Sequence, residues 1–299
     1  MSLVNKFFVI ILPLVPKIII GFFSKKYIAG PTLDQAIERI KDLNKRGIMA
    51  TIDILGEEID QKADALQVVQ EYKDVLAAIK KHHLDSNISV KPTHLGLKID
   101  KMFCLENMRA IVKEAEKHQN FVRIDMEDHT CTSDTLEMYL SLKKEFENVG
   151  VVIQSYLRRT MDDVRVLVNH HANLRLCKGI YLEPKSLAYK DPAIVNLNFN
   201  YALEKLLSNG CYVGIATHDE KLLWFALSLI DKLKLKKEAY EFQMLLGVTE
   251  DLRDLLVKEG HRMRIYVPYG EHWYAYSMRR LKENPHVAVS IFKNIFSSS

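Results

Sequence analysis

The sequence predicts an α/β fold, a distorted (βα)8 barrel of the TIM type with additional helices at its N-terminus. Three observations predict it. Eight short apolar runs recur along the 299 residues, helical patterns separate most of them, and polar side chains end many of the runs. Short, nearly continuous apolar strands between helices indicate parallel pairing with both faces buried, and eight such units close a barrel. An open doubly wound sheet is the alternative, but no G-x-G-x-x-G follows the first strand.

The first elements of this pattern are a capped helix and a strand. Thr32 lies three residues before Gln35, and this capping-box spacing begins an amphipathic helix that Gly47 ends. A run rich in β-formers follows directly, and a second helical pattern comes after it, which completes one unit. The same alternation repeats toward the C-terminus. The eight predicted strands are Met49–Leu55, Ile88–His94, Phe121–Glu127, Gly150–Tyr156, Leu174–Ile180, Tyr212–His218, Tyr240–Leu246 and Met263–Tyr269.

We predict two parts, an apolar N-terminal helical segment over residues 1–31 and a single barrel over residues 32–299. Within the first part, Phe7–Phe23 is nearly all apolar, but two prolines and a lysine interrupt it. It is also short for a membrane span, which needs ~20 apolar residues. A helix packed on the outside of the barrel is one interpretation. A peripheral membrane contact, favoured by nearby lysines, and a signal peptide are the others.

Composition limits the classes of function. The net charge of +4 is small for this length, and lysines alternate with acidic residues along helical faces, so nucleic-acid binding gets no support. The four cysteines include no C-x-x-C pair, so neither a zinc site nor a disulfide framework is indicated. We therefore expect a cytoplasmic protein, with a peripheral contact at the inner face of the membrane as the alternative.

The carboxyl ends of the predicted strands are unusually polar, and this is where barrels carry their chemistry. A barrel interior without a function would be mainly apolar, because charges are rarely buried without partners. The excess of cations favours an anionic ligand, either a carboxylate or a phosphate. Arg279 and Arg280 could bind a carboxylate through bidentate hydrogen bonds, or they could form a solvated basic helix end. The polar strand-end residues are Asp53, Lys91, Thr93, His94, Asp125, Glu127, Gln154, Tyr156, Arg175, Lys178, Thr217, His218, Gln243 and Tyr266.

Three other interpretations of these residues stay open. The acidic and histidine residues of DMEDH (125–129) and of THD (217–219) suggest a metal site, but no compact histidine set such as H-E-x-x-H accompanies them, so we expect no metal. Lys91 or Lys178 could form the Schiff base of an aldolase. A membrane-associated binding protein built on a barrel is the interpretation without catalysis.

Seven segments that span nearly the whole chain form a more specific pattern. They are SVKPTHLGL (Ser89–Leu97), VRIDMED (Val122–Asp128), VVIQSYLRR (Val151–Arg159), LRLCKGIYLEP (Leu174–Pro184), ATHD (Ala216–Asp219), EFQMLLGV (Glu241–Val248) and RIYVPYGEHWYAYSMRRLKENP (Arg264–Pro285). In this order they resemble the proline dehydrogenase family, including the proline dehydrogenase domain of the bifunctional proline-utilisation enzymes. The resemblance implies a distorted (βα)8 barrel whose last helix lies over the carboxyl ends of the strands.

The resemblance also implies roles for individual residues. Asp125 and Arg175 would be catalytic: Asp125 would order the site beside Lys91, and Arg175 would lie near the reactive nitrogen of FAD and favour the reduced, anionic flavin. Ile180 departs from the family, which usually has a small residue there. The resemblance therefore does not determine the local shape of the pocket at this position. The implied substrate-binding residues are Lys91, Tyr181, Leu246, Tyr266, Arg279, Arg280 and Glu283. The implied FAD-binding residues are Met126, Gln154, Arg175, Lys178, Gly179, Ile180, Thr217 and His218.

The reaction implied by the resemblance is the first step of proline catabolism. L-proline would be oxidised to Δ1-pyrroline-5-carboxylate by hydride transfer to FAD, and a membrane quinone would take the electrons. We expect the product to pass to a pyrroline-5-carboxylate dehydrogenase, because no aldehyde-dehydrogenase segment is present in this sequence.

Overall fold

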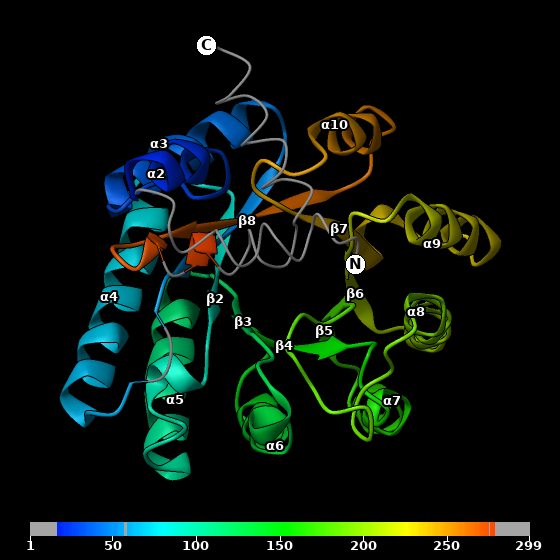
Figure 1. Ribbon diagram of the computed structural model, residues 1–299, viewed down its shortest axis with the longest axis horizontal. Coiled ribbons are helices and arrows are strands. Elements are labelled where there is room, and N and C mark those ends of the chain that lie inside the picture. The colour runs from blue at the N-terminus through cyan, green and yellow to red at the C-terminus, as the bar shows by residue number, and fades with distance from the viewer. Residues whose placement is uncertain (1–16, 57–58, 275, 279–299) are drawn as a thin grey trace.

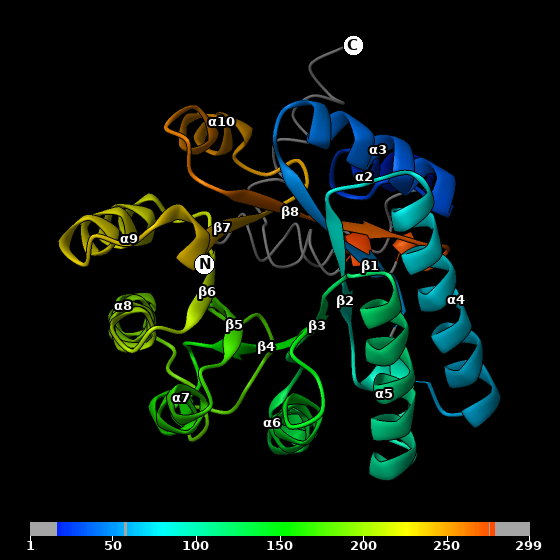
Figure 2. The ribbon, with the colours of Figure 1, turned by 180° about the vertical axis from the view of Figure 1, so that it is seen from behind.

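The computed structural model describes residues 17–56, 59–274 and 276–278, and its strands form one closed parallel barrel. The strands follow one another in chain order around the barrel, and β1 pairs with β8 from Met49 opposite Arg264 to Ile54 opposite Tyr269, which closes it (Figure 1; Figure 2). The predicted (βα)8 fold is therefore confirmed. The strands are β1 (Met49–Ile54), β2 (Ser86–Val90), β3 (Val122–Ile124), β4 (Val149–Gln154), β5 (Asn173–Cys177), β6 (Tyr212–Ala216), β7 (Tyr240–Leu245) and β8 (Met263–Tyr269).

Helices surround the strands, as Figure 1 shows. The predicted capping box at Thr32 is present, with Gln35 N donating to Thr32 Oγ1 and Thr32 N donating to Gln35 Oε1. Four helices begin with an aspartate whose carboxylate accepts a backbone N–H of the first turn, which satisfies a donor that has no partner inside the helix. The helices are α2 (Lys17–Tyr27), α3 (Leu33–Lys45), α4 (Lys62–Lys81), α5 (Lys101–Lys117), α6 (His129–Lys143), α7 (Thr160–Asn169), α8 (Pro192–Ser208), α9 (Glu220–Lys232) and α10 (Glu250–Lys258), with short 3-10 turns η2 (Thr93–Leu95) and η3 (Lys237–Ala239).

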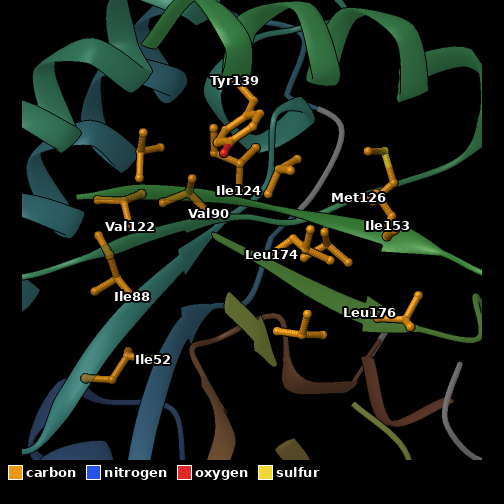
Figure 3. Close-up of a cluster of buried hydrophobic side chains, with 14 of the residues drawn as sticks. Ile52, Ile88, Val90, Val122, Ile124, Met126, Tyr139, Ile153, Leu174 and Leu176 are labelled. Atoms are coloured by element: carbon orange, nitrogen blue, oxygen red, sulfur yellow. The ribbon is translucent and has the colours of Figure 1, made fainter. Parts of the chain in front are cut away.

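The hydrophobic core lies between the strands and the helices. Alternate strand residues such as Ile52, Ile88 and Ile124 are fully buried and belong to one apolar cluster with helix residues, among them Tyr139 of α6 (Figure 3). Burying one such side chain contributes about 1.5–3 kcal/mol, so this outer layer supplies most of the stability. The residues between them on the same strands point into the barrel, and many of these are polar.

Several strands end earlier than the sequence predicted. β2 ends at Val90, because Pro92 has no N–H to continue the ladder, and η2 follows it. β3 ends at Ile124, β5 at Cys177 and β6 at Ala216. The apolar runs therefore overestimate strand length by several residues. As a result, most of the predicted site residues lie in the first loop positions after a strand, where the backbone leaves the sheet.

Part of the predicted N-terminal segment is described, and it packs on the barrel. Helix α2 buries Ile20, and its Ser24 Oγ lies 2.6 Å from Ser277 Oγ. Gly247, with φ +72°, allows the loop after β7 to approach α2, since a Cβ there would lie 2.1 Å from the Lys26 carbonyl oxygen. The division at residue 31 stays a prediction. Over residues 17–56, 59–274 and 276–278, no helix has both the length and the apolar character needed to cross a membrane.

The amino-terminal half of the barrel interior is held by a buried ion pair. Arg264 of β8 donates from Nε to Glu241 Oε1 at 2.8 Å and from Nη2 to Glu241 Oε2 at 3.1 Å. Tyr212 OH donates to the same carboxylate at 2.8 Å. Burial alone would raise the pKa of Glu241, but the charge and hydrogen bonds of Arg264, with those of Tyr212 and Gln243, lower it to about 2. The folded barrel thus favours the ionised carboxylate.

This pair predicts an acid-dependent loss of stability. The pKa of Glu241 is lower in the folded state than its usual 4.5, so its stabilising effect is present above pH 4.5 and is lost as the pH falls toward about 2. Glu241→Gln should lower the free energy of unfolding by about 3 kcal/mol at pH 7 and by about half of that or less at pH 3, measured by urea unfolding. Glu204→Gln, which breaks an exposed pair with Lys232, is the control and should have little effect. Equal losses for Glu241→Gln at both pH values would contradict this account.

Candidate active site

Three ion pairs lie toward the carboxyl end of the barrel, and each joins residues that lie on, or directly follow, different strands. Lys91 Nζ lies 2.5 Å from Asp53 Oδ1, Arg175 Nη1 lies 2.6 Å from Asp125 Oδ1, and Lys178 Nζ lies 2.6 Å from an Asp219 oxygen. A carboxylate from another strand faces each of these three cations, so they are not a simple excess of positive charge, and the anionic ligand that the sequence suggested stays a prediction. Each lysine ammonium is engaged with a carboxylate, whereas a Schiff-base lysine needs a free neutral amine.

Arg175 is the most connected side chain of the site. Besides Asp125, its Nη2 donates to Ser89 Oγ at 3.0 Å and its Nε donates to Gln243 Oε1. The guanidinium carbon lies 5.2 Å from the ring centroid of Tyr266, which is within the range of a cation–π contact. Strands β2, β3, β7 and β8 therefore all supply groups that fix one arginine on β5.

Tyr266 connects two of the ion pairs. Its OH donates to Asp125 Oδ2 at 2.7 Å and accepts from Lys91 Nζ at 3.3 Å. Burial raises the pKa of Tyr266 well above its usual value, and the charges of Asp125 and Asp53 raise it further, so the phenol stays a proton donor. Asp125 is thus linked to Lys91 through the Tyr266 hydroxyl, and its own direct cation is Arg175.

Asp53 is a site residue to which the sequence assigned no role. It is completely buried at the end of β1, and burial raises its pKa to about 6, although Lys91 opposes this rise while Asp125 adds to it. Its Oδ2 is buried and has no hydrogen-bond partner within the described ranges. The sequence signal is a charged residue inside the apolar run MATIDIL, since a buried charge without a function is rare.

Gln154 presents a second buried acceptor, at the end of β4. Its Nε2 donates to the backbone carbonyls of Met126 at 2.9 Å and Glu127 at 3.0 Å. Because both partners only accept, the amide orientation is determined and Oε1 points away from them. Oε1 is buried and finds no donor in the part of the chain that the structure describes. A bound group with an N–H would satisfy it.

The loop after β5 rests on an aromatic ring. Gly179 has φ +102°, and a Cβ there would lie 2.2 Å from the Tyr156 ring, so only glycine fits. The buried Glu183 ties the loop to α6 by accepting from His129 N at 2.8 Å. This conformation leaves Ile180 exposed at the surface. Tyr181 next to it is half-buried.

Thr217 and His218 follow β6 and brace neighbouring loops. His218 Nε2 accepts from Leu245 N at 3.1 Å, so in the neutral ring the proton is on Nδ1, which lies 2.8 Å from Thr249 Oγ1. Thr217 Oγ1 accepts from Asp219 N at 3.1 Å. The ring thereby supports the end of β7, where the predicted substrate residue Leu246 is buried.

The acidic residues of the DMEDH segment (125–129) mainly form hydrogen bonds with other groups of the protein. Glu127 accepts from Thr93 N at 2.9 Å and from Thr93 Oγ1 at 2.5 Å, which holds η2 against β3. Asp128 caps α6 by accepting from Thr130 N at 2.8 Å. Among the described residues, no group of three His, Cys, Asp or Glu side chains is arranged to hold a metal ion.

The structure thus brings most of the predicted site residues to one end of the barrel. Those at the carboxyl ends of β2 to β8 are Lys91, Asp125, Met126, Gln154, Arg175, Lys178, Gly179, Ile180, Tyr181, Thr217, His218, Leu246 and Tyr266. Arg279, Arg280 and Glu283 lie outside the described residues, and so does the greater part of the predicted last helix. The binding roles of all these residues stay predictions.

A closed βα barrel whose catalytic end is lined with buried, mutually bonded charges is typical of a barrel enzyme. The comparison with known families makes this more specific. A family model described as proline dehydrogenase matches residues 36–291. The chain therefore belongs to the proline dehydrogenase family, and the enzyme class that the resemblance predicted is confirmed.

Individual relatives agree with this family. The chain is 39% identical to proline dehydrogenase 1 of Bacillus subtilis (strain 168) over 272 residues, which cover 91% of this chain and 90% of the relative. It is 35% identical to a proline dehydrogenase of Deinococcus radiodurans over 277 residues, with 91% and 89% covered. Proline utilization A of Bdellovibrio bacteriovorus, solved after inactivation by N-propargylglycine, superposes with a TM-score of 0.82 at 28% identity. That match covers 87% of this chain and about a third (32%) of the longer one.

The conformation of the β5 loop gives a stability prediction. Gly179→Ala adds a Cβ in the left-handed region and against the Tyr156 ring, whereas Gly210→Ala adds one at φ +74° with no atom within 4 Å. Backbone strain alone costs about 1 kcal/mol, so Gly210→Ala should lose about that much. Gly179→Ala should lose at least ~1–2 kcal/mol more, because the ring must move. The two free energies of unfolding are compared by chemical denaturation, and equal losses would show that the ring contact is not restrictive.

Proposed function

We propose that this chain oxidises L-proline to Δ1-pyrroline-5-carboxylate with bound FAD, the first step of proline catabolism. The observation that carries the proposal is the continuous hydrogen-bonded chain at the barrel mouth, from Asp53 through Lys91, Tyr266 and Asp125 to Arg175. It places anionic acceptors and fixed cations within one buried site. Membership of the proline dehydrogenase family supports the choice of substrate.

FAD fits the residues at the ends of β4, β5 and β6. The family is generally flavin-dependent, and Gln154 Oε1, which is buried and has no donor among the described residues, is an acceptor suited to a flavin ring N–H. Arg175 supplies a fixed positive charge nearby, which favours negative charge on the bound ring. When bound, FAD would supply the acceptor for the substrate's hydride and its two electrons. The residues proposed to hold it are Met126, Gln154, Arg175, Lys178, Gly179, Ile180, Thr217 and His218.

The proline carboxylate is proposed to bind Lys91, Arg279 and Arg280. Asp53 already faces Lys91, so the net attraction for an anion depends chiefly on the two arginines. In this proposal Tyr266, Tyr181 and Leu246 enclose the pyrrolidine ring, and Glu283 is a further substrate-binding residue. Tyr266 is anchored by Asp125 and Lys91, so its ring is held in place before the substrate binds. Binding therefore costs no conformational entropy for fixing this side chain.

The chemistry requires the loss of one hydride from carbon and of protons from nitrogen. The ammonium form of proline first loses one proton; removing the hydride from the carbon next to nitrogen and the remaining N–H proton then leaves the C=N bond of the product. Asp53 Oδ2, which has no hydrogen-bond partner among the described residues, is the acceptor on which the ring N–H can be held. Asp125 and Arg175 keep each other oriented during the transfer.

Two partners complete the proposal, and both rest on family membership. A membrane quinone reoxidises the reduced cofactor, and a pyrroline-5-carboxylate dehydrogenase consumes the product. We propose no metal and no nucleic-acid partner. A peripheral membrane contact through the N-terminal segment is consistent with a quinone acceptor.

Flavin absorbance tests the proposal directly. The purified protein, reconstituted with FAD if necessary, should absorb as an oxidised flavin and bleach anaerobically on addition of L-proline. D-proline is the control for stereospecific binding and should bleach it far more slowly. A protein that binds FAD but is not reduced by L-proline, or that cannot take up FAD, would contradict the proposal.

The carboxylate site gives a separate prediction. A hydrogen bond to a charged group contributes about 1.5–3 kcal/mol, so Arg279→Met should weaken proline binding about 10- to 100-fold. Lys282→Met in the same segment is the matched control and should bind proline nearly as well as the parent protein. Binding is measured as the proline concentration that half-saturates the rate of flavin reduction. Equal effects of both substitutions would remove Arg279 from the site.

A further inference from the structure

We infer that Gln243 and Glu241 of β7 are positioning residues that fix the orientation of Arg175 from inside the barrel. They form a relay that links the Glu241–Arg264 pair in the amino-terminal half of the interior to Arg175 at the carboxyl end. The consequence for catalysis rests on the proposed function, because it assumes that flavin binds beside Arg175. The geometry of the relay itself does not depend on that assumption.

The first part of the argument is the amide of Gln243. Its Nε2 donates to Glu241 Oε1 at 2.6 Å, and its Oε1 accepts from Arg175 Nε. An ionised carboxylate only accepts and a guanidinium only donates, so the amide has a single orientation that satisfies both neighbours. A reversed amide would face N–H against N–H and oxygen against oxygen. Gln243 therefore transmits the position of Glu241 to Arg175.

The second part is the anchoring of Glu241. Its carboxylate accepts two hydrogen bonds from Arg264 of β8 and one from Tyr212 of β6. Arg264 in turn donates from Nη1 to the Ala50 carbonyl of β1 at 2.7 Å. Glu241, Gln243 and Arg264 are all buried. The relay thus begins from a carboxylate that is fixed by three other strands.

The third part is the space that the sequence leaves for Gln243. Gly214 of β6 stands in register with Glu241, and a Cβ on it would lie 2.4 Å from Gln243 Nε2. Any larger residue at this position would displace the amide. This is an independent sign that the interior accommodates the Gln243 side chain in its relay position.

A glutamine suits this position because it is neutral. Arg175 already pairs with one carboxylate, that of Asp125, and its other side-chain hydrogen bonds among the described residues go to the uncharged Ser89 and Gln243. The arginine is therefore oriented by three groups without a second negative charge that would cancel its own. A glutamate at position 243 would also place two carboxylates together, since Gln243 Nε2 now lies 2.6 Å from Glu241 Oε1.

The relay is tested first in the protein without flavin. In ¹⁵N spectra of the apoprotein, the Arg175 Nε–H signal is assigned by its loss in Arg175→Lys. We expect this proton to exchange slowly with solvent in the parent protein. In Gln243→Leu its exchange rate should rise at least tenfold. Gly214→Ala, which displaces the amide without removing it, should reduce the protection in the same direction. Gln67→Leu, which removes an exposed glutamine that bonds Glu71, is the control and should change nothing.

The flavin-loaded protein tests the consequence. Gln243→Glu keeps the side-chain shape but adds negative charge beside Arg175. The equilibrium preference for reduced over oxidised flavin should fall about tenfold. For a two-electron couple this corresponds to a midpoint potential lower by about 30 mV. Gln67→Leu should leave the potential unchanged.

The outcomes separate the relay from the proposed function. Unchanged Nε–H protection in folded Gln243→Leu and Gly214→Ala would overturn the relay, whether or not the protein oxidises proline. An intact relay in a protein that proline does not reduce would instead overturn the proposed function. Loss of protection with an unchanged potential in Gln243→Glu would overturn the inferred effect on flavin.

Discussion

Arg175 and Asp125 form an ion pair toward the carboxyl end of the barrel interior, where both side chains are buried. Removing two charges from water costs several kcal/mol for each ion, and this cost is offset only when hydrogen bonds satisfy their remaining polar atoms. The surrounding residues do this: Tyr266 donates to the second oxygen of Asp125, while Ser89 and Gln243 accept from Arg175. The need to keep this pair satisfied explains why strands β2, β7 and β8 all carry polar residues at their inward positions.

The same constraint organises the rest of the interior. A column of bonded polar groups runs from Arg264 and Glu241 to Lys91 and Asp53, while the apolar side chains of the same strands face the helices. Buried ion pairs are seldom better for stability than well-packed apolar residues. The outer layer therefore stabilises the barrel, and we attribute the polar column to the need for fixed charges at the catalytic end.

Much of the fold was predictable from the sequence, because its signals are local. Apolar runs and helical periodicity gave all eight strands, and the spacing of Thr32 and Gln35 gave a capping box. Strand ends were less predictable, since the apolar pattern continues into loops such as the one after Val90. The pairing of charges could not be predicted: Lys91 and Asp53 are 38 residues apart, and Arg175 and Asp125 are 50 residues apart. Only the pairing of the strands in space brings them together, so cations that looked free to bind an anion face carboxylates.

A crystal structure of the FAD-loaded protein with a non-oxidisable proline analogue tests the central claim most directly. The account predicts that the flavin ring lies over the ends of β4 to β6, in contact with Gln154 Oε1 and Arg175, and that the Arg175–Asp125 pair persists. It also predicts the analogue between the ring and Tyr266, with its nitrogen facing Asp53. A flavin bound away from Arg175, or an analogue bound outside the barrel mouth, would contradict it.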